Sequence, residues 1–344
     1  MSVEIAGIYP SVCASASCDR DFLFKFEADT FFKHLLHRDV VRLYLPTVIG
    51  FSVKCEMQKI PIHKNFSFGK IKKNLHNQKN IFIFVVNFDP LNRKTMPIYM
   101  LQDEVLDFPP VGQSTKDGLL AIGGDLSPER LLVAYSSGIF PWYQEGEPIL
   151  WWSLDPRMVL KPSELKITKS LWKTIESNKY SCSFDADFEG VIRACATVPR
   201  TDEQLEEEGD TDEPSPWISE DMIAAYCELH DMGYAHSVEV YLDNELVGGL
   251  YGVSIGKVFC AESMFHTKTD ASKVALYNLC QFLIRNGIEL IDAQQETAHM
   301  RRMGAAPIPR KEFIKILKGL VNEDSLVGNW GDGSAEFLKL EVIS

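Results

Sequence analysis

The chain has 344 residues, of which 45% are hydrophobic and 24% charged, which is enough for a sizeable core in one large domain or two smaller ones. No run of residues approaches the roughly 20 apolar residues that a membrane-spanning helix needs, which argues against a membrane protein. The eight cysteines include no CxxC pair and the eight histidines no HExxH motif, which indicates a reducing cytoplasm and no structural metal.

Charge separates the amino-terminal quarter from the rest. Residues 1–95 hold 14 Lys/Arg and 8 Asp/Glu, a net charge of +6, so residues 96–344 carry −19 of the total of −13. An acidic body argues against a general nucleic-acid-binding protein, since phosphate contacts need Lys and Arg. Residues 1–95 show no clear caps, repeats or sustained period, and we interpret them as an extension of doubtful status, disordered or not native. A protein that starts at Met96 is therefore expected to keep its activity.

Residues 96–165 are interpreted as a small α/β N-terminal domain. Ser127 as N-cap and Pro128 at the first helical position predict a helix that ends at Gly138. The segments 139–143 and 149–153 then concentrate three tryptophans in eleven residues. Such an aromatic cluster is usually core, and the alternative is a wall for an apolar ligand.

Residues 166–320 are interpreted as the main domain, followed by a C-terminal tail over 321–344. The stretch 199–216 is strongly acidic without apolar periodicity and predicts a surface insertion. Ser219 and Gly233 bound a predicted helix, and strands are expected over 237–242, 246–253 and 257–262 as a meander. A helix over about 271–286 and a strand over 288–292 follow. A meander, a helix and a further strand form the layout of a GNAT-type acyltransferase core, so the predicted class is α+β with a mixed sheet.

Polar side chains gather where the predicted strands end. Glu262 ends the last strand of the meander, while Asp292 and Gln294 alternate onto one face of the next strand. Acids in an apolar setting are costly to bury unless something binds them, which makes these residues functional candidates. The alternative is that Asp292 and Gln294 cap a strand end and that Glu262 pairs with a nearby cation.

Residues 96–344 contain two clusters of basic residues despite their negative net charge. The first contains Arg157, Lys161, Lys166, Lys169, Lys173 and Lys179, and the second Arg301, Arg302, Arg310, Lys311, Lys315 and Lys318. Without other evidence each is a solvated helix or loop face.

Several motifs in consistent order resemble the leucyl/phenylalanyl-tRNA-protein transferase family over roughly residues 96–320. They are Gly118 to Pro128, Gly138 to Trp142, Leu150 to Ser153 with Asp155-Pro156-Arg157, His236 to Glu239, Val247 to Val253, Phe259 to Phe265, and Leu290 to Gln294. One such motif would be weak, but several in register are not expected by chance. Residues 1–95, the acidic insertion and the tail lie outside the resemblance.

The resemblance implies an enzyme that moves Leu or Phe, and less readily Met, from aminoacyl-tRNA to the N-terminal Arg or Lys of a protein, marking it for degradation. It implies no cofactor and no metal, since the aminoacyl ester is already activated, and a cytoplasmic monomer that needs no membrane. Asp292 would be the base, acting through Gln294, and Glu262 would accept or orient amino groups. The basic residues Arg157, Lys166, Lys169, Lys173, Arg301 and Arg302 become candidates for contacts with tRNA phosphates.

The resemblance also assigns a pocket for the donor side chain, formed by Trp142, Trp217, Leu250, Phe259, Ala261, Met264, Leu279 and Ile291. An apolar cavity discriminates one methylene by only about 1 to 3 kcal/mol, so transfer of Met is expected alongside Leu and Phe. Leu250 stands where Met is common in the family and Ala261 where Gly is common, which leaves the preference between Leu and Phe open.

Two other classes of function share parts of this pattern. A coenzyme A-dependent GNAT-type N-acetyltransferase has the same layout, but it needs a glycine-rich turn before the helix, and Phe265 to Lys273 contains no glycine. A non-catalytic module that binds tRNA or a degron would keep the pockets without the chemistry.

Overall fold

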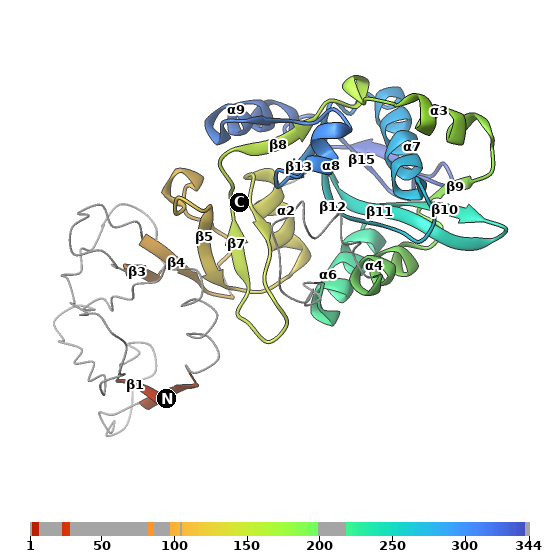
Figure 1. Ribbon diagram of the computed structural model, residues 1–344. Helices are drawn as coiled ribbons and strands as arrows, with labels where there is room; N and C mark the ends of the chain where they lie inside the picture. The colour runs from red at the N-terminus through yellow and green to blue at the C-terminus, as the bar shows by residue number, and fades with distance from the viewer. Residues whose placement is uncertain are drawn as a thin grey trace.

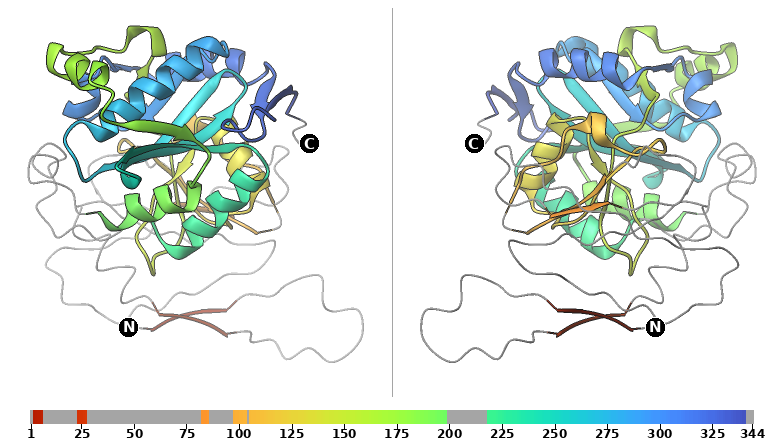
Figure 2. Two further views of the ribbon diagram at one scale, coloured as in Figure 1. Left: turned by 90° about the vertical axis from the view of Figure 1, so that its right-hand side faces the viewer. Right: turned by 90° about the vertical axis from the view of Figure 1, so that its left-hand side faces the viewer.

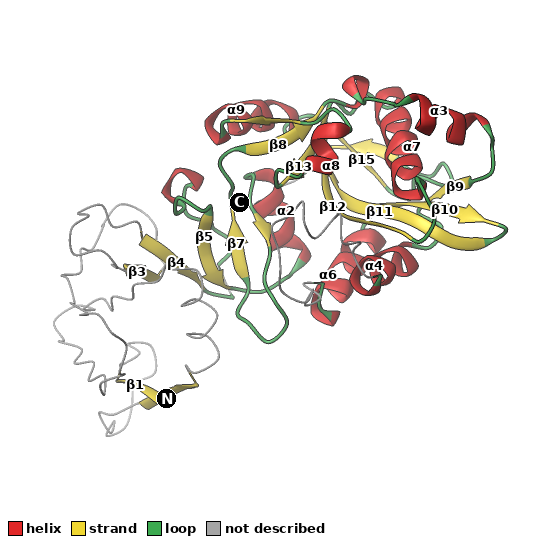
Figure 3. Ribbon diagram, viewed as in Figure 1, coloured by secondary structure: helices red, strands yellow, loops and turns green. Residues whose placement is uncertain are grey.

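The computed structural model describes residues 2–6, 23–27, 82–85, 97–103, 105–198 and 218–340. The expected start at Met96, the acidic insertion over 199–216 and the candidate pocket residue Trp217 lie outside these residues. Within them the mixed α/β class predicted from the sequence is confirmed, with helices packed on mixed sheets (Figure 3).

A smaller sheet forms the amino-terminal part, and its strands run in the order β3-β4-β5-β7-β6. The strands are β3 (Phe82–Val85), β4 (Pro97–Leu101), β5 (Leu119–Gly123), β6 (Phe140–Pro141) and β7 (Leu150–Trp152), with η1 (Val111–Gln113) before β5 and α2 (Pro128–Ser136) after it. Arg130 of α2 is fully buried, donates to the carbonyls of Gln102, Asp103 and Val105, and pairs with Asp125 at 3.2 Å. This arginine therefore ties α2 to the loop after β4. A separate hairpin pairs β1 (Ser2–Ala6) with β2 (Leu23–Glu27).

A larger sheet carries the rest of the chain, in the order β14-β8-β13-β12-β11-β10-β9. Its strands are β8 (Arg157–Leu160), β9 (Ser181–Phe184), β10 (Ala235–Leu242), β11 (Glu245–Ile255), β12 (Val258–His266), β13 (Leu290–Gln294) and β14 (Ala306–Ile308). The predicted meander is β10-β11-β12, and β13 adds to it in parallel after a helical crossover. β8 pairs with β13, so this strand joins the larger sheet although the sequence assigned it to the N-terminal domain.

Helices cover both faces of the larger sheet (Figures 1 and 2). On one face lies α7 (Ala271–Arg285), beside η2 (Pro162–Glu164) and α3 (Lys169–Glu176); on the other lie α4 (Phe188–Thr197) and α6 (Glu220–Asp231). The remaining elements are α8 (Ala298–Arg302), α9 (Arg310–Leu320) and the hairpin of β15 (Ser325–Val327) and β16 (Glu336–Leu338). Each face buries its own apolar cluster, one with α4 and α6 and one with α7.

The helix boundaries follow local chemistry that is visible in the sequence. The Ser219 side chain accepts the Met222 amide at the start of α6, as predicted, and Met222, Tyr226 and Leu229 are fully buried. The predicted helix α7 starts without such a cap, because Asp270 before it has φ +66° and makes no capping hydrogen bond. Its carboxylate instead contacts Lys273 at 2.9 Å and Thr174 of α3 at 3.1 Å, which joins the two helices.

Candidate active site

The parallel pairing of β12 with β13 extends from Val258 and Leu290 to Cys260 and Asp292. Glu262 and Gln294 each stand two residues beyond that last pair, one on each strand. The Gln294 Nε2 donates a hydrogen bond of 2.6 Å to the Glu262 Oε1, which bridges the two strands past the end of their ladder. Glu262 and Gln294 thus meet just past the place where β12 and β13 stop pairing. We call this place the strand gap.

Two β-bulges aim these side chains. Between β11 and β12 the pairing passes from Tyr251 with Ser263 to Gly252 with Ala261, so Glu262 is the extra residue. Between β13 and β8 the pairing skips Ala293, and Gln294 takes a left-handed φ of +56°. A bulge interrupts the alternation of a strand and re-aims the side chains around it. The simple alternation used to group Asp292 with Gln294 therefore does not describe how they meet.

Asp292 forms a buried ion pair with Arg157 of the neighbouring strand β8. The Arg157 Nε and Nη2 donate to the Asp292 Oδ1 and Oδ2, both at 2.7 Å, and each side chain is 1% exposed. The Gln294 backbone amide donates to the same Oδ1 at 3.0 Å. The structure thereby corrects the placement of Arg157 among the candidate phosphate contacts, because its guanidinium lies in the interior and is engaged by a carboxylate.

Two tyrosines continue the network from Glu262. The Tyr226 hydroxyl of α6 donates to the Glu262 Oε2 at 3.0 Å, and the Tyr135 hydroxyl of α2 hydrogen-bonds that of Tyr226. Burial raises the pKa of Glu262 to about 7, against hydrogen bonds from Tyr135, Tyr226 and Gln294 that lower it, and the Asp292 charge adds to the rise. Glu262 is half-buried as a residue, and its carboxyl changes protonation near neutral pH, as groups at functional sites often do.

This pKa has a measurable consequence for stability. The folded protein holds a proton on Glu262 up to about pH 7, whereas the unfolded chain releases it near 4.5, so the free energy of unfolding falls as pH rises between these values. At about 1.4 kcal/mol per pH unit the loss is on the order of 3 kcal/mol. We expect Glu262→Gln to remove most of this pH dependence, measured by urea unfolding at pH 5 and pH 8. Glu245→Gln, at an exposed position at the start of β11, is the control. An unchanged slope in Glu262→Gln would contradict the assignment.

Most of the predicted pocket residues share one apolar cluster on the α7 face. Leu250, Phe259, Leu279 and Ile291 are buried there, and Ala261 and Met264 pack against it partly buried. Phe259 and Ile291 face each other in the parallel pairing just before the strand gap. Trp142 instead packs, partly buried, against the cluster on the opposite face, near Trp152 at 5.7 Å.

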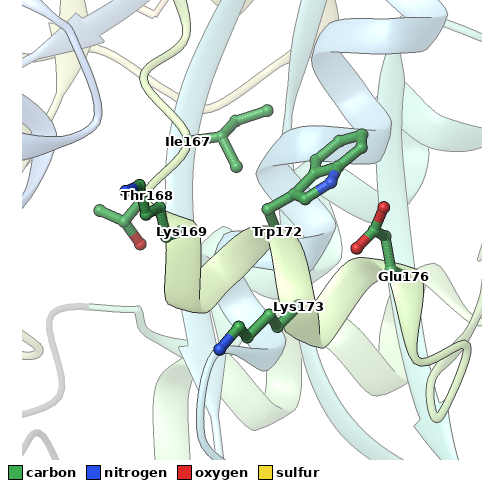
Figure 4. Close-up of a pocket in the computed structure, with 6 residues that line it drawn as sticks. All are labelled: Ile167, Thr168, Lys169, Trp172, Lys173 and Glu176. Carbon is green, nitrogen blue, oxygen red and sulfur yellow. The ribbon is translucent and has the colours of Figure 1, made fainter.

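The remaining basic candidates are exposed, and the fold joins their two clusters. The Lys166 amide donates to the Met303 carbonyl, which places Lys166 next to the end of α8 that carries Arg301 and Arg302. Arg301 pairs with Glu296, with Nε to Oε1 at 2.7 Å. Beside Lys166 lies an open groove of about 390 Å³ on α3 (Figure 4), lined by Ile167, Thr168, Lys169, Trp172, Lys173 and Glu176.

The sequence reasoning missed three participants in this site. Tyr135 and Tyr226 are on inward helix faces, where a hydroxyl needs a partner, and that requirement was the available signal. Arg157 belonged to a quoted motif, but the register that brings it opposite Asp292 could not be read from spacing. Neither the strand gap nor any other part of the described chain holds three or more His, Cys, Asp or Glu side chains arranged for a metal ion.

The fold and the site define the protein class. A meander, a helical crossover and a parallel strand bring a carboxyl and a carboxamide together beyond the β12–β13 pairing, in the layout that the sequence predicted for an acyltransferase core. The family model of leucyl/phenylalanyl-tRNA protein transferase matches residues 159–318, and that of its N-terminal domain matches residues 124–155. The chain belongs to this family and is an aminoacyltransferase.

Two relatives agree with that assignment. The leucyl/phenylalanyl-tRNA–protein transferase of Solidesulfovibrio magneticus is 50% identical over 68% of this chain and 91% of its own length. That of Syntrophobacter fumaroxidans is 53% identical over 64% of this chain and 90% of its own. Among solved structures, a GCN5-related N-acetyltransferase from Kribbella flavida is 14% identical, with a TM-score of 0.27, and covers 54% of this chain and 63% of its own. No helix among the described residues is long and apolar enough to cross a membrane.

Proposed function

We propose that the protein transfers Leu or Phe, and less readily Met, from aminoacyl-tRNA to the N-terminal Arg or Lys of an acceptor protein, which marks that protein for degradation. The observation that carries this proposal is the Gln294–Glu262 hydrogen bond across the strand gap, three residues along each strand from the buried pair Phe259 and Ile291. Gln294 and Glu262 offer polar groups for the aminoacyl ester and the acceptor amine, and the apolar cluster on the α7 face offers a place for the donor side chain.

The reaction needs little beyond positioning and one proton acceptor. The acceptor α-amine attacks the ester carbonyl carbon, an N–C bond forms, and the C–O bond to the tRNA ribose breaks. The amine loses a proton and the ribose oxygen gains one. An α-amine has an ordinary pKa of about 7.7 to 8.0, so a base of similar pKa suffices to hold it neutral.

The structure suggests a division of labour between the two acids. The family resemblance implies that Asp292 is the base, acting through Gln294, yet both Asp292 oxygens accept hydrogen bonds from Arg157. In our proposal Asp292 therefore holds Gln294, and Glu262, whose pKa lies at about 7, accepts the amine proton. The Gln294 carboxamide uses one N–H on Glu262, and its second N–H donates to the oxygen of the tetrahedral intermediate.

We propose further that the surface of α3 and α8 binds the tRNA. Lys166, Lys169 and Lys173 are exposed there, and Trp172 is 44% exposed between two of them, where an unpaired base can stack. Replacing both Lys169 and Lys173 by Ala should weaken charged-tRNA binding by about tenfold at physiological salt and lower the slope of log K against log salt by roughly 2. Filter binding at several salt concentrations measures both quantities. Exposed Lys116→Ala is the control, and an unchanged salt slope in the double variant would contradict this surface.

The direct test of the function incubates the protein with labelled Phe-tRNA and a peptide that begins with Arg. We expect label at the peptide amino terminus, and none in a peptide that begins with Glu. Folded protein that transfers no label to the Arg peptide would remove the proposal.

The coenzyme A alternative loses support at the start of α7. A pyrophosphate would need free backbone amides there, but the Ala271 amide donates to the Lys268 carbonyl. The negatively charged Asp270 carboxylate, engaged with Lys273 and Thr174, also belongs to the residue next to this end. We expect no heat of binding for acetyl-coenzyme A in calorimetry. We propose a cytoplasmic monomer as the working unit.

A further inference from the structure

Arg157 is linked to the strand gap through the Asp292 carboxylate, to which it donates two hydrogen bonds. It begins β8, which pairs with β13 on one side and β14 on the other, so its backbone is held in the larger sheet. Its guanidinium lies 4.7 Å from the ring centre of Phe140 of β6 and 4.8 Å from that of Phe313 of α9. Both rings are buried, which keeps water from the guanidinium and limits the directions in which it can turn.

We propose that Arg157 is a positioning residue for aminoacyl transfer: it fixes the Asp292 carboxylate, and through it the left-handed backbone and the side-chain direction of Gln294. This inference rests on the proposed function, and it assigns to Arg157 a role at the strand gap in place of a phosphate contact.

The first link of this chain of contacts is the fork between Arg157 and Asp292. Two parallel hydrogen bonds of 2.7 Å fix the plane of the carboxylate, which a single contact cannot do. The third guanidinium nitrogen, Nη1, has no hydrogen-bond partner among the described residues. Among the described residues, the orientation of the Arg157 guanidinium is therefore determined by Asp292 and the two phenylalanine rings.

The second link is the Gln294 backbone amide, which donates to the Asp292 Oδ1 at 3.0 Å. A non-glycine residue with positive φ is unfavourable and needs support from its surroundings. The Asp292 carboxylate, held by Arg157, supplies that support to Gln294, which directly follows the bulge at Ala293. The Gln294 side chain is thereby directed at Glu262, which it reaches at 2.6 Å.

A purely structural role for Arg157 predicts something different from a positioning role. If only buried charge or packing mattered, the folded fraction of Arg157→Lys would have nearly the kcat of the wild type. Lysine keeps the positive charge and most of the apolar stem. A lysine ammonium is a point charge and cannot reproduce the planar fork. The substitution Arg157→Lys therefore separates the orientation of the Asp292 carboxylate from the positive charge beside it.

The test measures transfer kinetics and backbone amide exchange in Arg157→Lys, with Arg193→Lys as the matched control on an exposed ion pair. We expect kcat to fall by roughly 10- to 100-fold, as for a reacting group displaced by about 1 Å, while KM for charged tRNA stays within about twofold. Exchange at Gln294 should become about tenfold faster relative to α6, since its acceptor is no longer fixed. Arg193→Lys should change neither quantity.

Wild-type kcat in folded Arg157→Lys, or unchanged exchange at Gln294, would overturn the inference. A fall in kcat that matches the unfolded fraction in a thermal melt would also overturn it, because stability alone would then explain the loss. If Arg157→Lys does not fold, Asp292→Asn tests the same fork from the other side with the same two readouts. A wild-type protein without transfer activity would remove the proposed function, while the exchange readout would still decide whether the fork holds Gln294.

Discussion

Replacing Gln294 by Ala should lower kcat for transfer from Phe-tRNA by about 10²- to 10³-fold, the usual loss when one donor to a developing oxyanion is removed. The affinity for charged tRNA should stay within about twofold, since the carboxamide acts on charge that appears only in the transition state. Pre-steady-state transfer to an Arg peptide, together with filter binding of the same Phe-tRNA, measures the two quantities separately.

The neighbouring residue offers a matched control for this variant. Gln295 is exposed and directly follows the strand, so Gln295→Ala removes the same side chain one position away and should leave kcat unchanged. Loss of tRNA affinity in Gln294→Ala with an unchanged kcat would assign the carboxamide to binding and would contradict its role in the intermediate. The Glu262 carboxyl also loses a hydrogen bond that lowers its pKa, so the pH at half-maximal kcat should move upward in this variant.

Local chemistry predicted the elements of the larger sheet well. The meander, the helix after it and the strand that carries Asp292 appear in the expected order, because alternating apolar residues, caps and glycine stops act over a few residues. The shorter elements were not predicted. β8 has only four residues, all buried, and a short apolar run of this kind has no periodicity that separates strand from helix.

The candidate site residues could be selected from the sequence, but their connections could not. Glu262, Asp292 and Gln294 were found from motifs, whereas the fork from Arg157 depends on the register of β8 against β13, set by tertiary pairing over 135 positions of sequence. The two bulges also escaped prediction, since one inserted residue changes which side chains share a face without changing composition. Nothing in the sequence therefore indicated that Arg157, one member of a basic cluster, is buried.

Asp292→Ala should destabilise the protein by about 3 to 5 kcal/mol, the cost of leaving one charge of a buried pair without its partner. The Arg157 guanidinium would remain between two buried phenylalanine rings with no carboxylate opposite its fork. Urea unfolding monitored by tryptophan fluorescence measures the change. The exposed pair of Arg193 with Glu220 provides the comparison, and Glu220→Ala should cost less than about 1 kcal/mol.

This expected loss means that an inactive Asp292→Ala would not by itself identify a catalytic acid. The double variant Arg157→Met with Asp292→Leu separates the two effects, because an apolar pair of similar volume often restores or exceeds the stability of a buried ion pair. We expect the double variant to recover most of the free energy of unfolding lost in Asp292→Ala and yet to remain deficient in transfer, since neither new side chain can hold the Gln294 amide. Recovery of transfer together with stability would show that the ion pair only fills the core. Continued loss of both would show that the fold itself requires the two charges.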